Sequence, residues 1–299
     1  MNRRNWVLLL ALAALWGASY LFIKIGLDDL SPAGIVFSRT ALAALVLMPF
    51  AIKSGGVAPL WRRAPGLFAL GAVQVAGPFL LISAGEQHIA SSLAGILVAS
   101  APIFTAIFAI WIDQSERLST NGVVGVAIGL LGVALLLGVD VSGSGLGGGL
   151  MVVLASVGYA IGGFALKRFF TGYQPLALVA GTMTASAIMT LPLFLIDLPS
   201  HVGPDTVAAM GALGLGGTGI AFVIYYTLNR EIGPTRTSLV AYVAPVFAVV
   251  YGVTLLDESF GVATAVGIVL IIGGSWLAAR SPARVPVEAA PVRPEPANV

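Results

Sequence analysis

The sequence has no cysteine, only two histidines and very little charge. Without cysteine the chain forms no disulfide and no thiolate metal site. His88 and His201 lie far apart in predicted loops, so neither a His-Glu-x-x-His zinc motif nor a histidine relay is present. No Gly-x-x-x-x-Gly-Lys-Ser/Thr segment occurs, which excludes a Walker-type ATP site. We therefore expect no metal, no cofactor and no ATP-driven pump.

Catalysis by a serine–lysine pair is the one enzymatic alternative that the sequence offers. Ser19 and Lys24 share one predicted helix. A spacing of five residues places the two side chains on different faces of a helix. We therefore predict that the chain is not an enzyme.

The scarcity of charge indicates a membrane protein. Charged residues make up 9% of the 299 residues and hydrophobic residues 58%, with a mean hydropathy of +0.99, whereas soluble domains are about 25% charged. A helix needs about 20 mainly apolar residues to span a bilayer. Ten such stretches occur, and their length and lack of two-residue alternation favour helices over strands: residues 5–26, 32–53, 64–84, 91–112, 121–139, 148–168, 175–196, 206–228, 235–255 and 261–280.

The chain is a tandem duplication. At a constant shift of 143 residues, Lys24 falls on Lys167, Pro32 on Pro175 and Pro102 on Pro245; after a slip of one residue, Glu116 falls on Glu258. Because each half crosses the membrane five times, the second copy is inverted, as in many secondary transporters. We predict an all-α polytopic protein with repeats at 5–139 and 148–280 around a central cavity. A Gly/Ser linker at 140–147 joins the repeats, and a disordered, Pro-rich tail follows at 281–299.

Basic residues set the orientation. All of the 15 Lys and Arg residues except Lys24 and Arg39 fall on one side of the predicted spans. The positive-inside rule then places both termini in the cytoplasm, the tail included. The sequence pI near 9.0 reflects these loops, so we expect membrane lipids and no nucleic acid as partners. No feature of the sequence indicates an oligomeric state.

Carboxylates are almost absent from the predicted bilayer interior. Every acidic residue lies at a predicted helix end, in a loop or in the tail. Buried Asp or Glu residues are the usual proton carriers in coupled transport. The pattern therefore favours facilitated movement of substrate down its gradient.

Aromatic residues point to a cavity wall. Trp16, Tyr20 and Lys24 recur at every fourth position on one face of the first helix. Trp16 lies too deep for an interfacial girdle, so we interpret Trp16 and Tyr20 as facing the cavity and Lys24 as a rim charge that snorkels to the outer surface. Tyr159 repeats Trp16 in the second half, and Lys167 repeats Lys24.

Two polar residues and two prolines complete the candidate site. Gln74 and Arg39 are hard to place in lipid and are expected to face the interior; Arg39 either attracts a substrate carboxylate or makes a structural bond to neighbouring helices, which we favour. Thr182 takes its place in the other half. Pro102 and Pro245 lie inside spans, where a proline removes a backbone hydrogen bond and kinks the helix. Each is interpreted equally well as a hinge or as a static kink.

The order and doubling of short motifs resemble those of a known family. The motifs are Leu15-Trp16-Gly17-Ala18-Ser19-Tyr20, Phe37-Ser38-Arg39, Ala99-Ser100-Ala101-Pro102, Ala241-Tyr242-Val243-Ala244-Pro245, and Gly-rich helices after Glu116 and Glu258. Over about residues 5–280 the chain resembles the EamA-type drug/metabolite transporters, and among them the bacterial YddG-like amino-acid exporters. The resemblance implies a basket-shaped bundle with a central cavity in the bacterial inner membrane, and export of amino acids and related metabolites.

Together these features predict a secondary transporter that works by alternating access. Aromatic faces would hold aromatic or hydrophobic substrates, and the polar groups would satisfy their polar ends. Alternatives are a multidrug exporter, a pore or a lipid scramblase. The predicted cavity residues are Trp16, Ser19, Tyr20, Gln74, Phe79, Ser100, Tyr159, Tyr225 and Tyr242, with Pro102 and Pro245 as hinges and Lys24 and Arg39 as rim charges.

Overall fold

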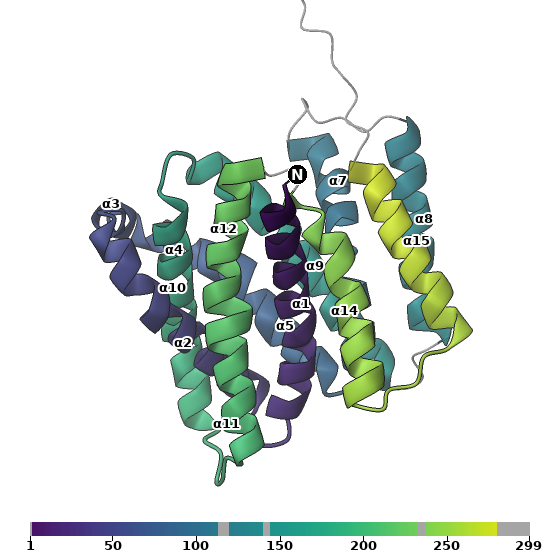
Figure 1. Cartoon of the computed structure of the whole chain (residues 1–299), viewed down its shortest axis with the longest axis horizontal. Coiled ribbons are helices and arrows are strands. Elements are labelled where there is room, and N and C mark those ends of the chain that lie inside the picture. Colours follow the sequence, from purple (N-terminus) through teal and green to yellow (C-terminus); the bar gives the residue numbers. More distant parts are fainter. Residues whose placement is uncertain (1, 113–119, 140–143, 233–236, 280–299) are drawn as a thin grey trace, which may run out of the picture.

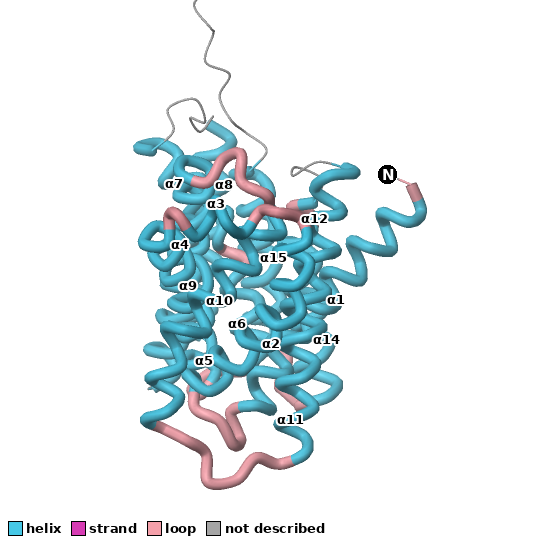
Figure 2. Tube along the Cα trace, turned by 90° about the vertical axis from the view of Figure 1, so that its left-hand side faces the viewer, coloured by secondary structure: helices cyan, strands magenta, loops and turns pink. Residues whose placement is uncertain are grey.

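The computed structural model is a bundle of helices (Figure 1). It describes the chain except residues 1, 113–119, 140–143, 233–236 and 280–299. The predicted tail, the start of the linker and Glu116 therefore lie outside the described residues. Figure 2 shows the bundle turned by 90°, with its longer loops gathered at two opposite ends.

The first half supplies five spans. They are α1 (Arg3–Gly26); α2 (Pro32–Lys53); the composite of α4 (Ala64–Gly71), the π-helix η1 (Ala72–Ala76) and α5 (Gly77–Glu86); the pair α6 (Ser91–Val98) and α7 (Ala101–Ile112); and α8 (Thr120–Val139). A short helix, α3 (Val57–Trp61), follows α2.

The second half repeats this order. Its spans are α9 (Ser144–Phe169); α10 (Pro175–Ile196); the composite of α11 (Pro204–Gly211), the π-helix η3 (Ala212–Ile220) and α12 (Ala221–Ile232); α14 (Val240–Leu255); and α15 (Val262–Ala279). Eight spans are long and apolar enough to cross a membrane, and α14 and α15 are shorter apolar helices. The prediction of an all-α protein with ten spans is confirmed. Helix α9 begins at Ser144, so the described part of the predicted linker is helical.

The same local signal starts the second span of each half. Pro32 and Pro175 occupy the first helical positions of α2 and α10. Proline suits this place because its fixed φ is helical and its missing N–H would have had no partner there. Ser31 also caps α2, since its side chain accepts a hydrogen bond from the Gly34 N–H at 3.3 Å.

The halves pack against each other through two pairs of equivalent helices, α2 on α10 and α8 on α15. The first spans of the two halves pack on non-equivalent partners, α1 on α14 and α9 on α5. Glycines bring α8 and α15 into backbone contact: a Cβ atom added at Gly274 would lie 2.4 Å from the Gly129 nitrogen and 2.6 Å from the Gly125 oxygen. These two helices brace one side of the bundle, on the right in Figure 1.

The two ends of the bundle differ in charge. One end, at the top of Figure 1, carries the start of α1 with Arg3 and Arg4 and the end of α9 with Lys167 and Arg168. We call it the basic end. The opposite end carries Asp28 and Asp29 after α1, Asp205 in α11, and the loop between α14 and α15 with Asp257 and Glu258. We call it the acidic end.

Candidate functional site: a cavity between the two halves

A cavity of about 640 Å³ lies between the two halves. Most of its wall comes from residues at equivalent positions of the repeat. At the shift of 143 residues, these pairs line it: Trp16 and Tyr159, Ile23 and Leu166, Arg39 and Thr182, Gln74 and Gly217, Phe79 and Phe222, Ile82 and Tyr225, Val98 and Ala241, Ala101 and Ala244, Pro102 and Pro245. The cavity is therefore a product of the duplication.

The cavity extends from the middle of the bundle to the basic end. Its lining residues Ala109, Leu166, Leu178 and Ala278 lie within the first or last turn of their helices at the basic end. Toward the acidic end, the wall closes over Ile23 and Ile82, which belong to a buried cluster of apolar side chains. Among the described residues, the cavity therefore reaches the basic end and is closed toward the acidic end.

Aromatic side chains form one side of the wall. The ring of Trp16 lies 5.5 Å from that of Tyr225 and 6.0 Å from that of Phe222, measured between centroids, the latter edge to face. Such geometry suits the aromatic quadrupoles. Trp16 and Tyr225 are only partly buried, so they present faces to the cavity as well as to each other.

Seven predicted cavity residues line this space and two do not. Those that line it are Trp16, Ser19, Tyr20, Gln74, Phe79, Tyr159 and Tyr225. Ser100 is fully buried and donates to the Leu97 carbonyl at 2.6 Å. The Tyr242 hydroxyl lies 3.4 Å from the Ser275 carbonyl oxygen on α15. Ser100 thus bonds to the backbone of its own span, as serines in helices often do, whereas the contact of Tyr242 with α15 is one that spacing along the sequence does not reveal.

The fourth span is broken where the sequence predicted a kink. Helix α6 ends at Val98 and α7 begins at Ala101, so Pro102 lies in the first turn of α7, where it removes no helical hydrogen bond. The Ala99 carbonyl at the break accepts a bond from Ser275 Oγ at 2.9 Å. Pro245, by contrast, lies inside α14 as expected.

Both third spans contain a π-helical segment at corresponding positions. Residues 72–76 and 212–220 form η1 and η3, which place Gln74 and Gly217 at the cavity. Within η3, Thr218 Oγ1 donates to the Leu213 carbonyl five residues earlier, at 2.9 Å. Single π-helical turns are frequent at functional sites. Sequence spacing gave no signal for them.

Arg39 is the only charged side chain among the described residues of the cavity wall. It is 5% exposed. Its Nε and Nη2 atoms donate to Thr218 Oγ1 at 3.3 and 3.2 Å, and its Cζ lies 3.7 Å from the centroid of the Phe79 ring. The guanidinium therefore joins α2 to both third spans, and it faces the cavity rather than its rim.

Lys24 does not extend to the surface as expected. Its Nζ donates to the carbonyl oxygens of Glu86 at 2.5 Å, the last residue of α5, and of Ile89 at 3.1 Å, in the loop that follows. A cation is favourable there because the Glu86 carbonyl belongs to the negative end of the helix dipole. Lys24 thus ties α1 to α5 at the acidic end and does not line the cavity.

Two carboxylates close the acidic end across the halves. Glu258 of the second half accepts from the Ser91 and Ser92 N–H groups, at 2.7 and 2.9 Å, and so caps the start of α6 in the first half. Asp29 of the first half accepts from the Gly203 N–H at 2.8 Å and the Thr206 hydroxyl at 2.6 Å. The hydroxyl bond, with the backbone bond after it, lowers the pKa of Asp29 below its ordinary value.

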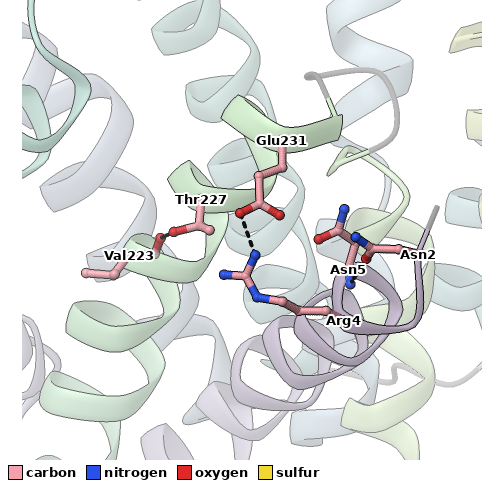
Figure 3. A network of polar contacts seen from close by, with 6 residues as sticks. All are labelled: Asn2, Arg4, Asn5, Val223, Thr227 and Glu231. Atoms are coloured by element: carbon pink, nitrogen blue, oxygen red, sulfur yellow. Dashed lines mark hydrogen bonds and ion pairs between the residues drawn. The ribbon is translucent and has the colours of Figure 1, made fainter.

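The contacts between the halves at the basic end are exposed: Arg63 Nη1 donates to the Phe169 carbonyl at 3.3 Å and Gln174 Nε2 to the Ser54 carbonyl at 3.0 Å. Figure 3 shows Arg4 at the start of α1 reaching Glu231 on α12, with Nη1 and Oε1 2.7 Å apart. The Arg4 side chain is 63% exposed. Exposed ion pairs contribute only about 0–1 kcal/mol, so this contact holds the basic end together loosely.

Glu86 is buried more deeply than its place at a helix end suggested. Its side chain has no exposed surface, and neither carboxylate oxygen has a hydrogen-bond partner among the described residues. It does not line the cavity. Within the described part of the chain, no group of three His, Cys, Asp or Glu residues could hold a metal ion.

Comparison with known proteins identifies both repeats. The model of the EamA-like transporter family matches residues 4–138 and again 146–280. The uncharacterized inner membrane transporter YedA of Escherichia coli K12 is 30% identical over 294 residues, which cover 93% of this chain and 94% of YedA. An uncharacterized transporter of Archaeoglobus fulgidus is 27% identical, over 93% of this chain and 99% of its own length.

Two further similarities concern substrate and fold. A probable terminal-alkyne amino-acid exporter of Streptantibioticus cattleyicolor is 26% identical, over 86% of this chain and 87% of that protein. One solved crystal structure superposes with a TM-score of 0.67 at 21% identity, over 93% of this chain and 98% of that chain. At this identity, the superposition supports the fold alone.

Proposed function

Because the chain belongs to the EamA-like transporter family, we propose that it exports amino acids and related small metabolites by alternating access. It is a multi-pass membrane transporter and not an enzyme. The observation that carries the proposal is the cavity, which equivalent positions of two inverted repeats line from both sides. Binding sites between inverted repeats are the rule in secondary transporters.

The orientation follows from charge. We place the basic end, with both termini, in the cytoplasm, and the acidic end outside, in agreement with the positive-inside rule. The cavity then opens to the cytoplasm, and the acidic-end contacts of Lys24, Asp29 and Glu258 hold the outer side closed. The structure is on this assignment an inward-facing state ready to load substrate for export. The relative YedA is an inner membrane transporter, and the same membrane is proposed here.

Two observations support amino acids with apolar side chains. The rings of Trp16, Phe222 and Tyr225 offer apolar faces, while Gln74, Tyr20 and Tyr159 offer polar groups on the same wall. A relative of 26% identity is a probable amino-acid exporter, and the motifs resemble those of the YddG-like exporters. The mainly apolar wall also suits a multidrug exporter, which is the second candidate.

Facilitated transport is the proposed mode, because no carboxylate is among the described residues that line the cavity. A closed outer side supports a carrier over a pore or a scramblase, since either of those would need a continuous path.

Flux into proteoliposomes tests the proposal. Uptake of phenylalanine or tryptophan should saturate with concentration and should change little when a proton gradient is imposed. Flux that rises without limit would indicate a pore, concentrative uptake driven by the gradient would contradict facilitation, and transport of lipophilic dyes but no amino acid would favour the multidrug candidate.

A further inference from the structure

The Arg39 guanidinium is buried in the cavity wall without a counterion. Among the residues that the structure describes, it forms no ion pair; its hydrogen-bond acceptor is one hydroxyl, Thr218 Oγ1. A guanidinium carries five N–H donors, and Nε and Nη2 share this single oxygen. The remaining donors belong to a side chain that lines the cavity.

Thr218 cannot neutralise the charge. Its hydroxyl proton is engaged by the Leu213 carbonyl at 2.9 Å, so the oxygen acts toward Arg39 as a neutral acceptor. The Phe79 ring, 3.7 Å from Cζ, adds a cation–π contact to one face of the guanidinium. These contacts hold the group in place, but none carries a negative charge.

Glu86, the buried carboxylate at the end of α5, does not fill this role, because neither of its oxygens forms a hydrogen bond with Arg39. The other titratable groups that face Arg39 are the phenols of Tyr20 on α1 and Tyr159 on α9. A buried cation without a paired anion is costly, so a ligand anion would gain by completing the pair.

We propose that Arg39 is the anion-binding residue of the cavity and takes the carboxylate of the transported molecule through its free N–H donors. This inference rests on the proposed function and narrows its substrate class to acids and amino acids with aromatic or apolar side chains. Binding of organic cations is disfavoured because their positive charge would be repelled by the Arg39 guanidinium. The planar fork of arginine matches a carboxylate, which makes such pairs stronger and more specific than those of lysine.

The alternative, a purely structural Arg39, predicts a different dependence on ligand charge. If Arg39 served only to join α2 to Phe79 and Thr218, its effect on the stability of the fold would be the same whichever ligand is present. An anion site instead distinguishes ligands that differ only in the carboxylate. The distinction can be read in the wild-type protein, without a substitution that risks misfolding.

The experiment measures binding of three indole compounds to the purified full-length protein in detergent by thermal shift and titration. Indole-3-propionate and tryptophan carry the carboxylate, and tryptamine lacks it. We expect both acids to bind at least about tenfold more tightly than tryptamine, given the strength of charge-assisted hydrogen bonds. Arg39→Gln should remove this preference, and Arg39→Lys should retain part of it.

Lys24→Gln is the matched control. It removes the other cation of the first two helices, which lies at the acidic end and does not line the cavity, so the preference for acids should persist. Equal or tighter binding of tryptamine by the wild type, or no binding of either acid, would overturn the anion site. Transport that saturates for all three compounds alike would overturn it while leaving the proposed function intact, whereas acid binding without transport would contradict the proposed function alone.

Discussion

The two halves share one fold but not one chemistry. Helices at equivalent positions line the cavity, and the rings of Phe79 and Phe222 are conserved between the repeats. The polar residues are not: Arg39 corresponds to Thr182, and its partner Thr218 corresponds to Val75. Duplication has thus supplied a symmetric space, and substitution has placed charge on one side of it. A substrate held there would be oriented by that asymmetry.

The ends of the halves differ in the same way. Lys24 holds carbonyls at the acidic end, while its counterpart Lys167 is exposed at the basic end. Asp29 bridges to Gly203 and Thr206, while its counterpart is Gly172, which has no side chain to bridge with. Equivalent positions therefore close one end and leave the other open. In an alternating-access cycle, the closed end is the one whose contacts must break.

The largest expected effect concerns the packing of α8 on α15. Gly274→Leu should lower the melting temperature in detergent by an amount on the order of 5 °C or abolish folding, because a side chain there would meet the Gly129 backbone. The neighbouring Gly273→Leu is the control, since a Cβ atom added there meets nothing within 4 Å. Equal melting temperatures for the two variants would show that this contact does not brace the bundle.

A second prediction exchanges the polar residues between the halves. Arg39→Thr should weaken transport of aromatic acids about tenfold, and adding Thr182→Arg should restore much of it, because both positions line the cavity. Initial rates in proteoliposomes measure this. If the double variant transports no faster than Arg39→Thr, the difference between the halves involves more than the position of the arginine. The single variant Thr182→Arg shows the effect of the added side-chain volume alone.

The sequence predicted the spans because they depend on strong, local signals, and for the same reason seven of the nine residues that it assigned to a cavity lie at the cavity wall. Long apolar runs define the helices. Trp16 lies too deep in its span to belong to an interfacial aromatic girdle, so its position predicts a cavity residue. The sequence did not predict the features that depend on packing between distant segments of the chain. The break at Ala99 is stabilised by Ser275, 176 residues away, and Tyr242 is engaged by the same residue's carbonyl.

The same reasoning explains the errors over charged residues. The sequence places Lys24 at the surface because it gives the depth of Lys24 in the first span but not its partners, the Glu86 and Ile89 carbonyls. Glu86 follows the predicted span 64–84 and is the last residue of α5, yet its burial depends on the neighbours that cover that end. Whether Arg39 faces a carboxylate is likewise a property of the assembled bundle. Depth in a membrane can be read from one helix, whereas pairing cannot.

A smaller effect is expected from the two prolines, which occupy equivalent positions in different surroundings. Pro245→Ala should raise the melting temperature by about 2 °C, because alanine restores a hydrogen bond inside α14, and should slow transport if the kink is a hinge. Pro102→Ala should change the melting temperature less, since Pro102 begins α7. Thermal melts and turnover of both variants measure this. Equal responses would mean that Pro102, at the break in the fourth span, and Pro245, inside α14, have the same mechanical role.

The smallest effect should come from Asp29, which joins the halves at the acidic end. Its pKa is lowered in the folded protein by the bonds from Thr206 and Gly203. The stability it contributes is therefore present above its unfolded pKa, about 3.9, and is lost as the pH falls through the folded value. Asp29→Asn should lower the melting temperature slightly between pH 6 and 8 and should converge with the wild type at acidic pH. Asp28→Asn, at the exposed neighbouring position, is the control and should leave the profile unchanged. A constant difference between wild type and Asp29→Asn at every pH would mean that the carboxylate charge is not what holds this end closed.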